Sequence, residues 1–185
     1  QADTTANHTV LNATNLAALE AADLIIVSRT TNSGNYATDA AEVTQWNSIE
    51  TPLILFGAYT ARNNRWLWIN SAAITEYAAE TMLEVVQADH PVFRGISPVN
   101  NQVDVIDGSV NAGQCSFITG TDVGNGTLIA RRADNGNIWI AEWEAGTPFY
   151  AATTQQPAEK RMLLTAGGGG AQVAGSMNFT PAGQR

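Results

Sequence analysis

Runs of apolar residues, separated by polar and glycine-rich stretches, divide this chain into short predicted strands and helices. Near-continuous apolar runs at 24–27 and 53–57 are typical of strands that are buried on both faces of a sheet. A stretch of helical periodicity lies between them, and Thr38 or Asp39 can cap its amino end. Strand, helix and strand in this order predict a βαβ unit, and therefore a parallel sheet, in the first third of the chain.

The rest of the chain predicts short strands, one further helix near the start and a hairpin. The helix is expected at about 15–22, with Asn15 as its N-cap. Residues 71–80 are expected to form a helical turn or a loop. Asn135 and Gly136 between two apolar runs predict a β-hairpin near residues 127–143 with a type I′ turn. Further strands are expected at 10–11, 81–86, 103–106, 115–118 and 161–166.

Length and composition predict one domain over residues 1–185. Thr180 and Pro181 are typical of a helix start, so we expect the domain to be a fragment of a longer chain, with its last helix cut. The net charge of −8 argues against binding nucleic acid, and no apolar run is long enough to predict membrane insertion. The single Cys115 excludes an intramolecular disulfide and a multi-cysteine zinc site, so we expect no metal and no cofactor. Low lysine with abundant asparagine and threonine favours a bacterial protein that is secreted or at the cell surface.

Cationic, aromatic and hydroxyl side chains follow the two predicted parallel strands, where open α/β sheets bind ligands. Exposed indoles can stack on sugars, with arginines holding hydroxyl groups. The alternative is that the indoles pack over the sheet and the arginines pair with acidic neighbours. The candidate ligand-binding residues are Ser28, Arg29, Tyr59, Arg62, Trp66 and Trp68.

Four other residues are candidates for catalysis, although none stands in a decisive motif. Glu142 and Glu144 lie two positions apart on a predicted strand, a spacing that permits the two carboxylates of a glycosidase. Asp89 and His90 could supply a base with its orienting partner. The structural alternatives are exposed glutamates that serve solubility and a histidine that caps the turn before Pro91.

Five segments resemble the class I glutamine amidotransferase-like superfamily, and specifically its ThuA-like (trehalose-utilisation) branch found in secreted bacterial multidomain proteins. The resemblance implies a flavodoxin-like three-layer sandwich, with helices on both faces of a mainly parallel sheet. It also implies that the first strand and helix of that fold precede Val10; residues 1–9 are too short to supply both, so we expect the first strand to be missing or cut here. The matching segments are ADLIIVSR (22–29), PLILFGAYTAR (52–62), DHPVFRGI (89–96), NIWIAEWEAG (137–146) and RMLLTAGGG (161–169).

The same resemblance bears on catalysis, because catalytic members place a cysteine on a tight turn between a strand and a helix. Ala58 stands at about that position here, and the only cysteine, Cys115, lies in another predicted strand among apolar neighbours. We therefore expect a non-catalytic binding or interaction module, with a carbohydrate or a protein as its partner. The alternatives are a glycan-directed hydrolase that uses acidic residues and His90, and a structural domain of an extracellular assembly.

Overall fold

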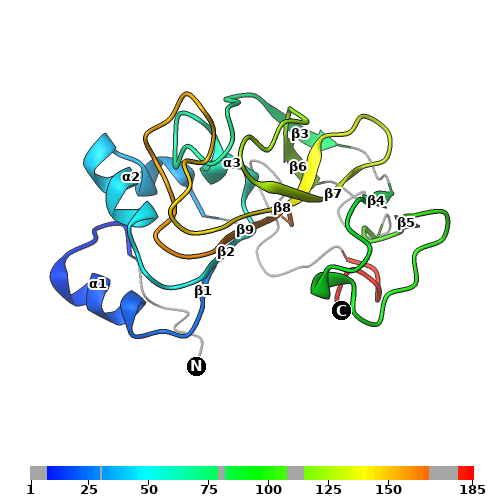
Figure 1. The fold of residues 1–185 in the computed structure, drawn as a ribbon, viewed down its shortest axis with the longest axis horizontal. Helices are drawn as coiled ribbons and strands as arrows, with labels where there is room; N and C mark the ends of the chain where they lie inside the picture. Colours follow the sequence, from blue (N-terminus) through cyan, green and yellow to red (C-terminus); the bar gives the residue numbers. More distant parts are fainter. Residues whose placement is uncertain (1–7, 30, 79–81, 108–114, 167–178) are drawn as a thin grey trace.

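A computed structural model describes residues 8–29, 31–78, 82–107, 115–166 and 179–185 of the chain, and these residues form an α/β fold (Figure 1). Its main element is a seven-stranded mixed sheet with the strand order β1-β2-β9-β8-β7-β4-β5. The strands are β1 (Ile25–Val27), β2 (Leu53–Leu55), β4 (Leu83–Val85), β5 (Gln102–Val103), β7 (Thr127–Arg132), β8 (Ile138–Trp143) and β9 (Arg161–Leu164).

Parallel and antiparallel pairing divide the sheet into two halves. β1, β2 and β9 are parallel, whereas β9-β8, β8-β7, β7-β4 and β4-β5 pair antiparallel. The expected parallel pairing of the first two strands is therefore confirmed, but the sheet as a whole is mixed. A separate two-stranded antiparallel sheet contains β3 (Ile74–Ala78) and β6 (Cys115–Ile118).

Helices are few and short among the described residues. They are α1 (Ala13–Glu20), α2 (Ala40–Asn47) and α3 (Ala58–Ala61), with the 3₁₀ turns η1 (Ser33–Tyr36) and η2 (Pro91–Phe93). Asp39 caps α2 as expected, because its side chain accepts the N–H of Glu42 at 2.9 Å. The N-cap of α1 is Asn12 instead of Asn15: the Asn12 side chain accepts the N–H of Asn15, so the helix begins earlier than the apolar pattern indicated.

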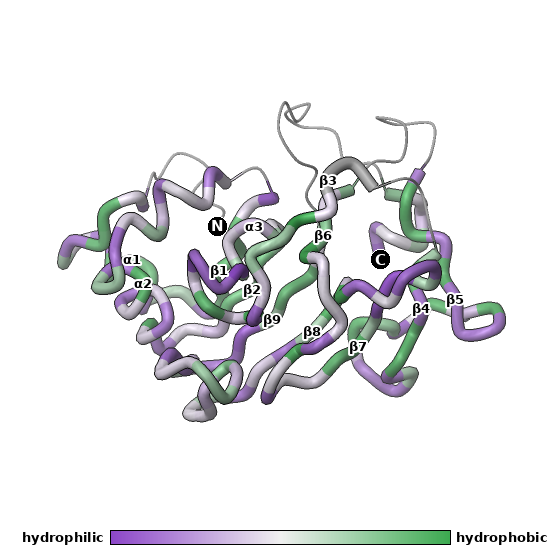
Figure 2. The backbone as a smooth tube through the Cα atoms, turned by 90° about the horizontal axis from the view of Figure 1, so that it is seen from above, coloured by the Kyte–Doolittle hydropathy of each residue, from purple (hydrophilic) through white to green (hydrophobic). Residues whose placement is uncertain are grey.

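Two hydrophobic clusters form the core. The first contains Leu53, Leu55 and Leu163 from the parallel strands, packed with residues of α1, α2 and α3 and with an aromatic group described below. The second lies under the other half of the sheet and includes Trp139 and Ile140. Figure 2 shows that hydrophobic stretches follow strands such as β4 and β6, while many connecting loops are hydrophilic.

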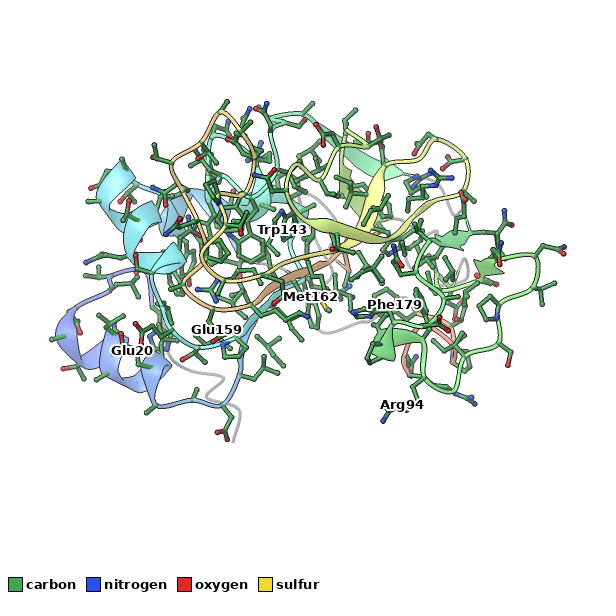
Figure 3. All side chains as sticks on the ribbon, viewed as in Figure 1. Glu20, Arg94, Trp143, Glu159, Met162 and Phe179 are labelled. Atoms are coloured by element: carbon green, nitrogen blue, oxygen red, sulfur yellow. The ribbon has the colours of Figure 1, made fainter. Side chains whose placement is uncertain are left out.

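All three described helices contribute to the first cluster, so helices on both faces of the sheet are not confirmed by the described residues. Trp143 of β8 and Met162 of β9 mark the two faces of the sheet (Figure 3). Trp143 is 2% exposed within the first cluster, whereas Met162 is only half-buried and Ile26 of β1, on the other side of its strand from Ile25, is 58% exposed. The three-layer arrangement expected from the resemblance thus has support on one face only.

Three local expectations fail, and the first of them has an identifiable reason. Residues 74–78 form strand β3, because they find a partner strand in β6 that the sequence did not reveal. Residues 10–11 are not in a strand, and the residues after Thr180 form turns, although the Thr180 hydroxyl accepts the N–H of Gly183 as an N-cap would. The region of four glycines at 167–170 lies outside the described residues.

The hairpin near residues 127–143 is confirmed, but its turn differs from the expectation. β7 and β8 pair antiparallel, and the connecting residues return the chain through hydrogen bonds between Arg132 and Asn137 at 2.8 Å and between Gly136 and Arg132 at 2.9 Å. Gly136 has φ +76°, whereas Asn135 has no positive φ. Because a type I′ turn needs positive φ at both central residues, the loop is a longer one.

Candidate functional site

The candidate tryptophans are part of the core, and the expectation that they form an exposed sugar-stacking platform is wrong. Trp66 is 1% exposed and Trp68 is fully buried. Trp46 stacks on Trp66 with ring centroids 4.9 Å apart, and Trp68 stacks on Phe149 at 5.7 Å. These contacts link α2, the loop after α3 and the loop after β8, which is the packing alternative.

Polar contacts fix the same indoles. The Trp68 indole N–H donates to Oδ1 of Asn47 at 2.9 Å, and Nδ2 of Asn47 donates to the backbone carbonyl of Trp66 at 3.0 Å and to Oε1 of Gln155 at 2.9 Å. The Trp66 indole N–H donates to the carbonyl of Tyr36. Each indole therefore has its polar atom satisfied inside the protein, and neither offers that atom to a ligand.

The other candidate ligand residues lie at the carboxyl ends of β1 and β2, as the parallel pairing required. Ser28 is exposed and Arg29 is buried at 9% exposure. Arg62 lies 5.3 Å from the ring centroid of Tyr59 and donates from Nε to the Tyr59 carbonyl at 2.8 Å. Arg62 therefore serves largely to hold its own turn in place, and only Ser28 is openly presented to solvent.

The turn between β2 and α3 has the place in the chain where catalytic members of the resembled family carry a nucleophile. Gly57 is the N-cap of α3, and an added Cβ at this residue would make ordinary contacts of 3.7 Å with the carbonyls of Ser28 and Arg29. Ala58 follows at 1% exposure. A methyl group in this position cannot act as a nucleophile, whatever the geometry of the turn.

Cys115 does not compensate for the alanine. It begins β6 and is 1% exposed, and burial raises the pKa of its thiol to about 12 despite the opposing influence of the Ser116 backbone, Arg132 and Arg29. Because the thiolate is the reactive form, this thiol is unreactive at neutral pH. The sequence-based interpretation of Cys115 as a small buried hydrophobe agrees with its environment.

Three of the four candidate catalytic residues meet in one cluster, which we call the His90 cluster: His90, Glu142, Glu144 and Lys160. Nε2 of His90 lies 3.2 Å from Oε2 of Glu142, and the ammonium of Lys160 lies 2.9 Å from Glu142 and 3.0 Å from Glu144. His90 and Glu142 are largely buried, with side-chain exposures of 16% and 12%. Asp89 is exposed, and none of the described contacts brings it into the cluster.

The hydrogen bonds of His90 limit what the cluster can do chemically. Nδ1 accepts the backbone N–H of Val92 at 3.2 Å, so a neutral ring carries its proton on Nε2 and donates it to Glu142. Both ring nitrogens are then engaged, and neither is available to take a proton from a substrate. His90 acts here as the cap of η2, which was the structural alternative for this residue.

Lys160 was not identified from the sequence, yet it forms ion pairs with both glutamates. Its ammonium contacts both carboxylates, and the side-chain hydrogen bond to Glu142 raises the pKa of Lys160, with Glu144 adding to the effect. A glycosidase needs free space between its two carboxylates for the glycosidic oxygen or a water molecule. Here an ammonium group occupies that space. A lysine just before an apolar strand is too common a feature to have indicated this pairing.

The two groups of candidate residues lie at opposite ends of the parallel strands. Ser28 and Arg29 follow β1, and Ala58 comes shortly after β2, at the carboxyl ends of these strands. Lys160 directly precedes β9, and Glu142 pairs with Met162 near the amino end of the same strand. The structure therefore does not unite the sequence-predicted ligand site with the sequence-predicted catalytic residues. Within the described ranges, no group of three or more His, Cys, Asp or Glu side chains could hold a metal ion.

Comparison with known proteins gives one informative result. No family model matches the chain, and no curated protein matches it. A solved structure of a cytoplasmic protein from Salmonella typhimurium is similar in fold, with a TM-score of 0.52 at 11% sequence identity. The similarity covers 86% of this chain and 66% of that protein, slightly less than two thirds of it. At this identity the likeness concerns the fold alone, which is α/β.

The comparison contradicts one expectation from composition. A secreted or cell-surface protein was expected, but the similar protein is a cytoplasmic one. The expectation rested on amino-acid usage and on the resemblance to secreted bacterial proteins, and it is not maintained. Among the helices of the described segments, none has the length and apolar character needed to cross a membrane.

Proposed function

We propose that this chain is a non-catalytic, amidotransferase-like α/β domain that acts as a binding or interaction module. The observation that carries the proposal is Ala58 at the turn between β2 and α3, where the resembled family needs a nucleophile. The buried thiol of Cys115 supports it, because that thiol cannot replace the missing one. We further propose that β1, β2 and β9 correspond to the parallel part of a flavodoxin-like sheet, as the resemblance implies.

The proposal names no sugar as the partner. A carbohydrate partner was expected from the family resemblance and from exposed tryptophans, and the tryptophans do not support it because both indoles lie in the core. The partner is instead a protein or a small molecule that binds elsewhere on the domain.

Catalysis is tested with a panel of chromogenic esters and glycosides together with a glutamine hydrolysis assay. We expect no turnover above that of heat-denatured protein. Turnover that is abolished in Glu142→Gln or His90→Ala, and kept in the exposed control Glu20→Gln, would overturn the proposal. The control changes a carboxylate to an amide in the same way, but on α1.

A glycan-directed hydrolase is the second candidate, and one observation favours it. His90 and Glu142 do approach each other, at 3.2 Å, as an acid–base pair would. The engagement of both ring nitrogens and the ammonium between the carboxylates oppose this function. The substrate panel above separates the two candidates directly.

A structural role in an assembly is the third candidate. Leu24, just before β1, is 44% exposed and Ile26 of β1 is 58% exposed, and among the described residues this edge strand pairs only with β2. An edge strand with apolar side chains can accept a strand from a second copy. Sedimentation velocity tests this: self-association that Ile26→Glu abolishes would favour the assembly, and a monomer at all concentrations would exclude it.

A further inference from the structure

An apolar cavity of about 380 Å³ lies beside the second hydrophobic cluster, away from Ser28 and Ala58. Its floor is the sheet, with Trp139 and Ile140 of β8 and Leu164 of β9. Its walls are two segments that are far apart in sequence, residues 91–96 around η2 and residues 179–185. Phe93 and Phe179 contribute one aromatic ring from each wall. A mainly apolar cavity of this size is within the range of small-molecule sites.

Both walls are held in place by hydrogen bonds. In the 179–185 wall, the Thr180 hydroxyl donates to the Asp104 carbonyl at 2.7 Å, and the Thr180 N–H donates to the Val105 carbonyl at 3.2 Å. In the η2 wall, the N–H of Ile96 donates to the Phe93 carbonyl at 3.0 Å, and His90 ties the segment to Glu142 of β8. The cavity is therefore preformed, which lowers the ordering cost of binding.

The charge at this cavity differs from that of the chain as a whole. The chain has 17 acidic and 9 basic residues, yet the described lining residues include two arginines, Arg94 and Arg185, and no carboxylate. Nη1 of Arg185 donates to the Gly95 carbonyl at 3.3 Å, which joins the two walls. Arg94 is exposed and extends away from the body of the protein (Figure 3). An apolar interior with cationic groups at its solvent side is complementary to an amphiphilic anion.

We propose that this cavity binds a small molecule with an apolar body and one anionic group, of the chemical class of a medium-chain monocarboxylate. The cavity volume corresponds to about a dozen water molecules at ~30 Å³ each, so it admits one short apolar chain and excludes a large ligand. The apolar chain lies against Trp139, Ile140 and Leu164, and the carboxylate lies at the solvent side of the cavity, beside Arg185, where the exposed Arg94 side chain turns toward it on binding. This inference rests on the proposed function, since it names the ligand of the binding module.

Isothermal titration calorimetry with three probes of equal chain length tests the ligand class. Decanoate, decanol and decyltrimethylammonium share an apolar chain and differ in charge. We expect decanoate to bind with 1:1 stoichiometry, decanol to bind about fivefold more weakly, and the cation not to bind. An anionic membrane surface also presents apolar chains with anionic groups. Vesicles that contain phosphatidylglycerol test this alternative ligand, and we expect no binding to them.

Two variants and a control locate the site. Arg94→Glu should weaken decanoate binding about tenfold without affecting folding, because Arg94 is exposed. Arg65→Glu makes the same change of charge in the loop after α3 and should leave the affinity unchanged. Ala182→Trp places an indole in the cavity, since Ala182 lines it, and should abolish binding.

The outcomes separate this inference from the proposed function. Equal binding of decanol and decanoate, or an unchanged affinity in Arg94→Glu, would overturn the anionic ligand class. Absence of binding by all three probes would overturn the cavity as a ligand site, and vesicle binding that the same variants abolish would replace a free ligand with a membrane surface. None of these results bears on turnover, whereas turnover in the substrate panel would overturn the non-catalytic proposal without changing the affinities measured by calorimetry.

Discussion

Asn47, at the last position of α2, offers a sharp test of how the aromatic core is held together. The residue is 2% exposed and its side chain makes three hydrogen bonds, of which Nδ2 donates two and Oδ1 accepts one. Asn47→Asp keeps the shape and the accepting oxygen. It replaces both donors with a second oxygen that faces the Trp66 carbonyl and Oε1 of Gln155. The substitution therefore tests hydrogen bonding and charge without a change in packing.

The magnitude follows from the burial and the contacts. Loss of two hydrogen bonds costs about 2 kcal/mol, since each contributes about 1 kcal/mol. Burial of a carboxylate at this position raises its pKa in the folded state, and the Arg161 guanidinium, whose Nη2 donates to the Asn47 backbone carbonyl at 3.3 Å, offsets only part of this effect. A net rise of ~3 units costs a further ~4 kcal/mol once the unfolded chain is ionised. We expect Asn47→Asp to lose about 6 kcal/mol of unfolding free energy at pH 7, which is a large share of the stability of an ordinary domain.

The pH dependence distinguishes the two contributions. Because the folded-state pKa of the new carboxyl is raised, the unfolded state releases its proton first, and the stability of the variant falls as pH rises above about 4. Urea unfolding of wild type and variant across pH 4 to 8 should give a difference in free energy that shrinks by ~4 kcal/mol on acidification. Asn70→Asp is the control, since Asn70 is exposed and its Oδ1 only accepts a hydrogen bond. A variant within 1 kcal/mol of wild type at pH 7, or a difference independent of pH, would refute this reasoning.

Three further predictions follow from particular contacts. Gly126→Ala should destabilise the protein by about 2–3 kcal/mol, because an added Cβ would collide with the Trp143 indole, whereas Gly146→Ala, with φ +76° and no atom within 4 Å, should cost only about 1–2 kcal/mol in thermal unfolding. Cys115 should not react with a thiol reagent at pH 8 in the native protein and should react fully in guanidinium chloride, since burial raises its pKa to about 12. Because the pKa of Lys160 is raised above its ordinary value of 10.5, its ion pairs stabilise the fold below that pH and are lost at higher pH. In denaturant titrations between pH 9 and 12, wild type should therefore lose more unfolding free energy than Lys160→Met. The difference should be less than about 1 kcal/mol, because the lysine is part-exposed.

Local patterns along the chain predicted the elements that depend on near neighbours. The two apolar runs became the parallel strands β1 and β2, the intervening helix is capped by Asp39, and the hairpin lies where Asn135 and Gly136 placed it. Each of these features is set by residues a few positions apart. The strand β3 escaped prediction because its partner β6 lies about 40 positions away, as the pairing of Ile74 with Ile118 shows.

Several residues of the candidate site were predicted from the sequence, but their roles were not. The sequence identified Trp66, Trp68, His90 and Glu142, yet burial and partners decide what such residues do. The hydrogen-bond partners of the Asn47 side chain lie 19, 21 and 108 positions away along the chain. The His90 ring contacts Glu142, which is 52 positions away. A pattern within one segment of the chain cannot predict a contact between residues that are far apart in the sequence. The roles of these residues could therefore be assigned only from the structure.

His90 itself provides the final test, because it links the His90 cluster to the cavity wall. Its ring makes two distinct contacts, one to the backbone of Val92 and one to Glu142. His90→Asn keeps an acceptor that can cap η2, but asparagine is too short to reach Glu142, whereas His90→Ala loses both contacts. We expect His90→Ala to cost about 2 kcal/mol and His90→Asn about 1 kcal/mol in urea unfolding.

The same two variants separate a positioning role from catalysis. If His90 positions the wall that carries Phe93 and Arg94, decanoate affinity should fall in both variants, and more in His90→Ala, in proportion to their loss of stability. A base would instead need a free ring nitrogen, and its loss would abolish turnover in both variants alike while leaving the affinity for decanoate unchanged. Equal stability of His90→Asn and His90→Ala would show that the hydrogen bond from Val92 contributes nothing. The link between η2 and β8 would then have to reside in the contact with Glu142 alone.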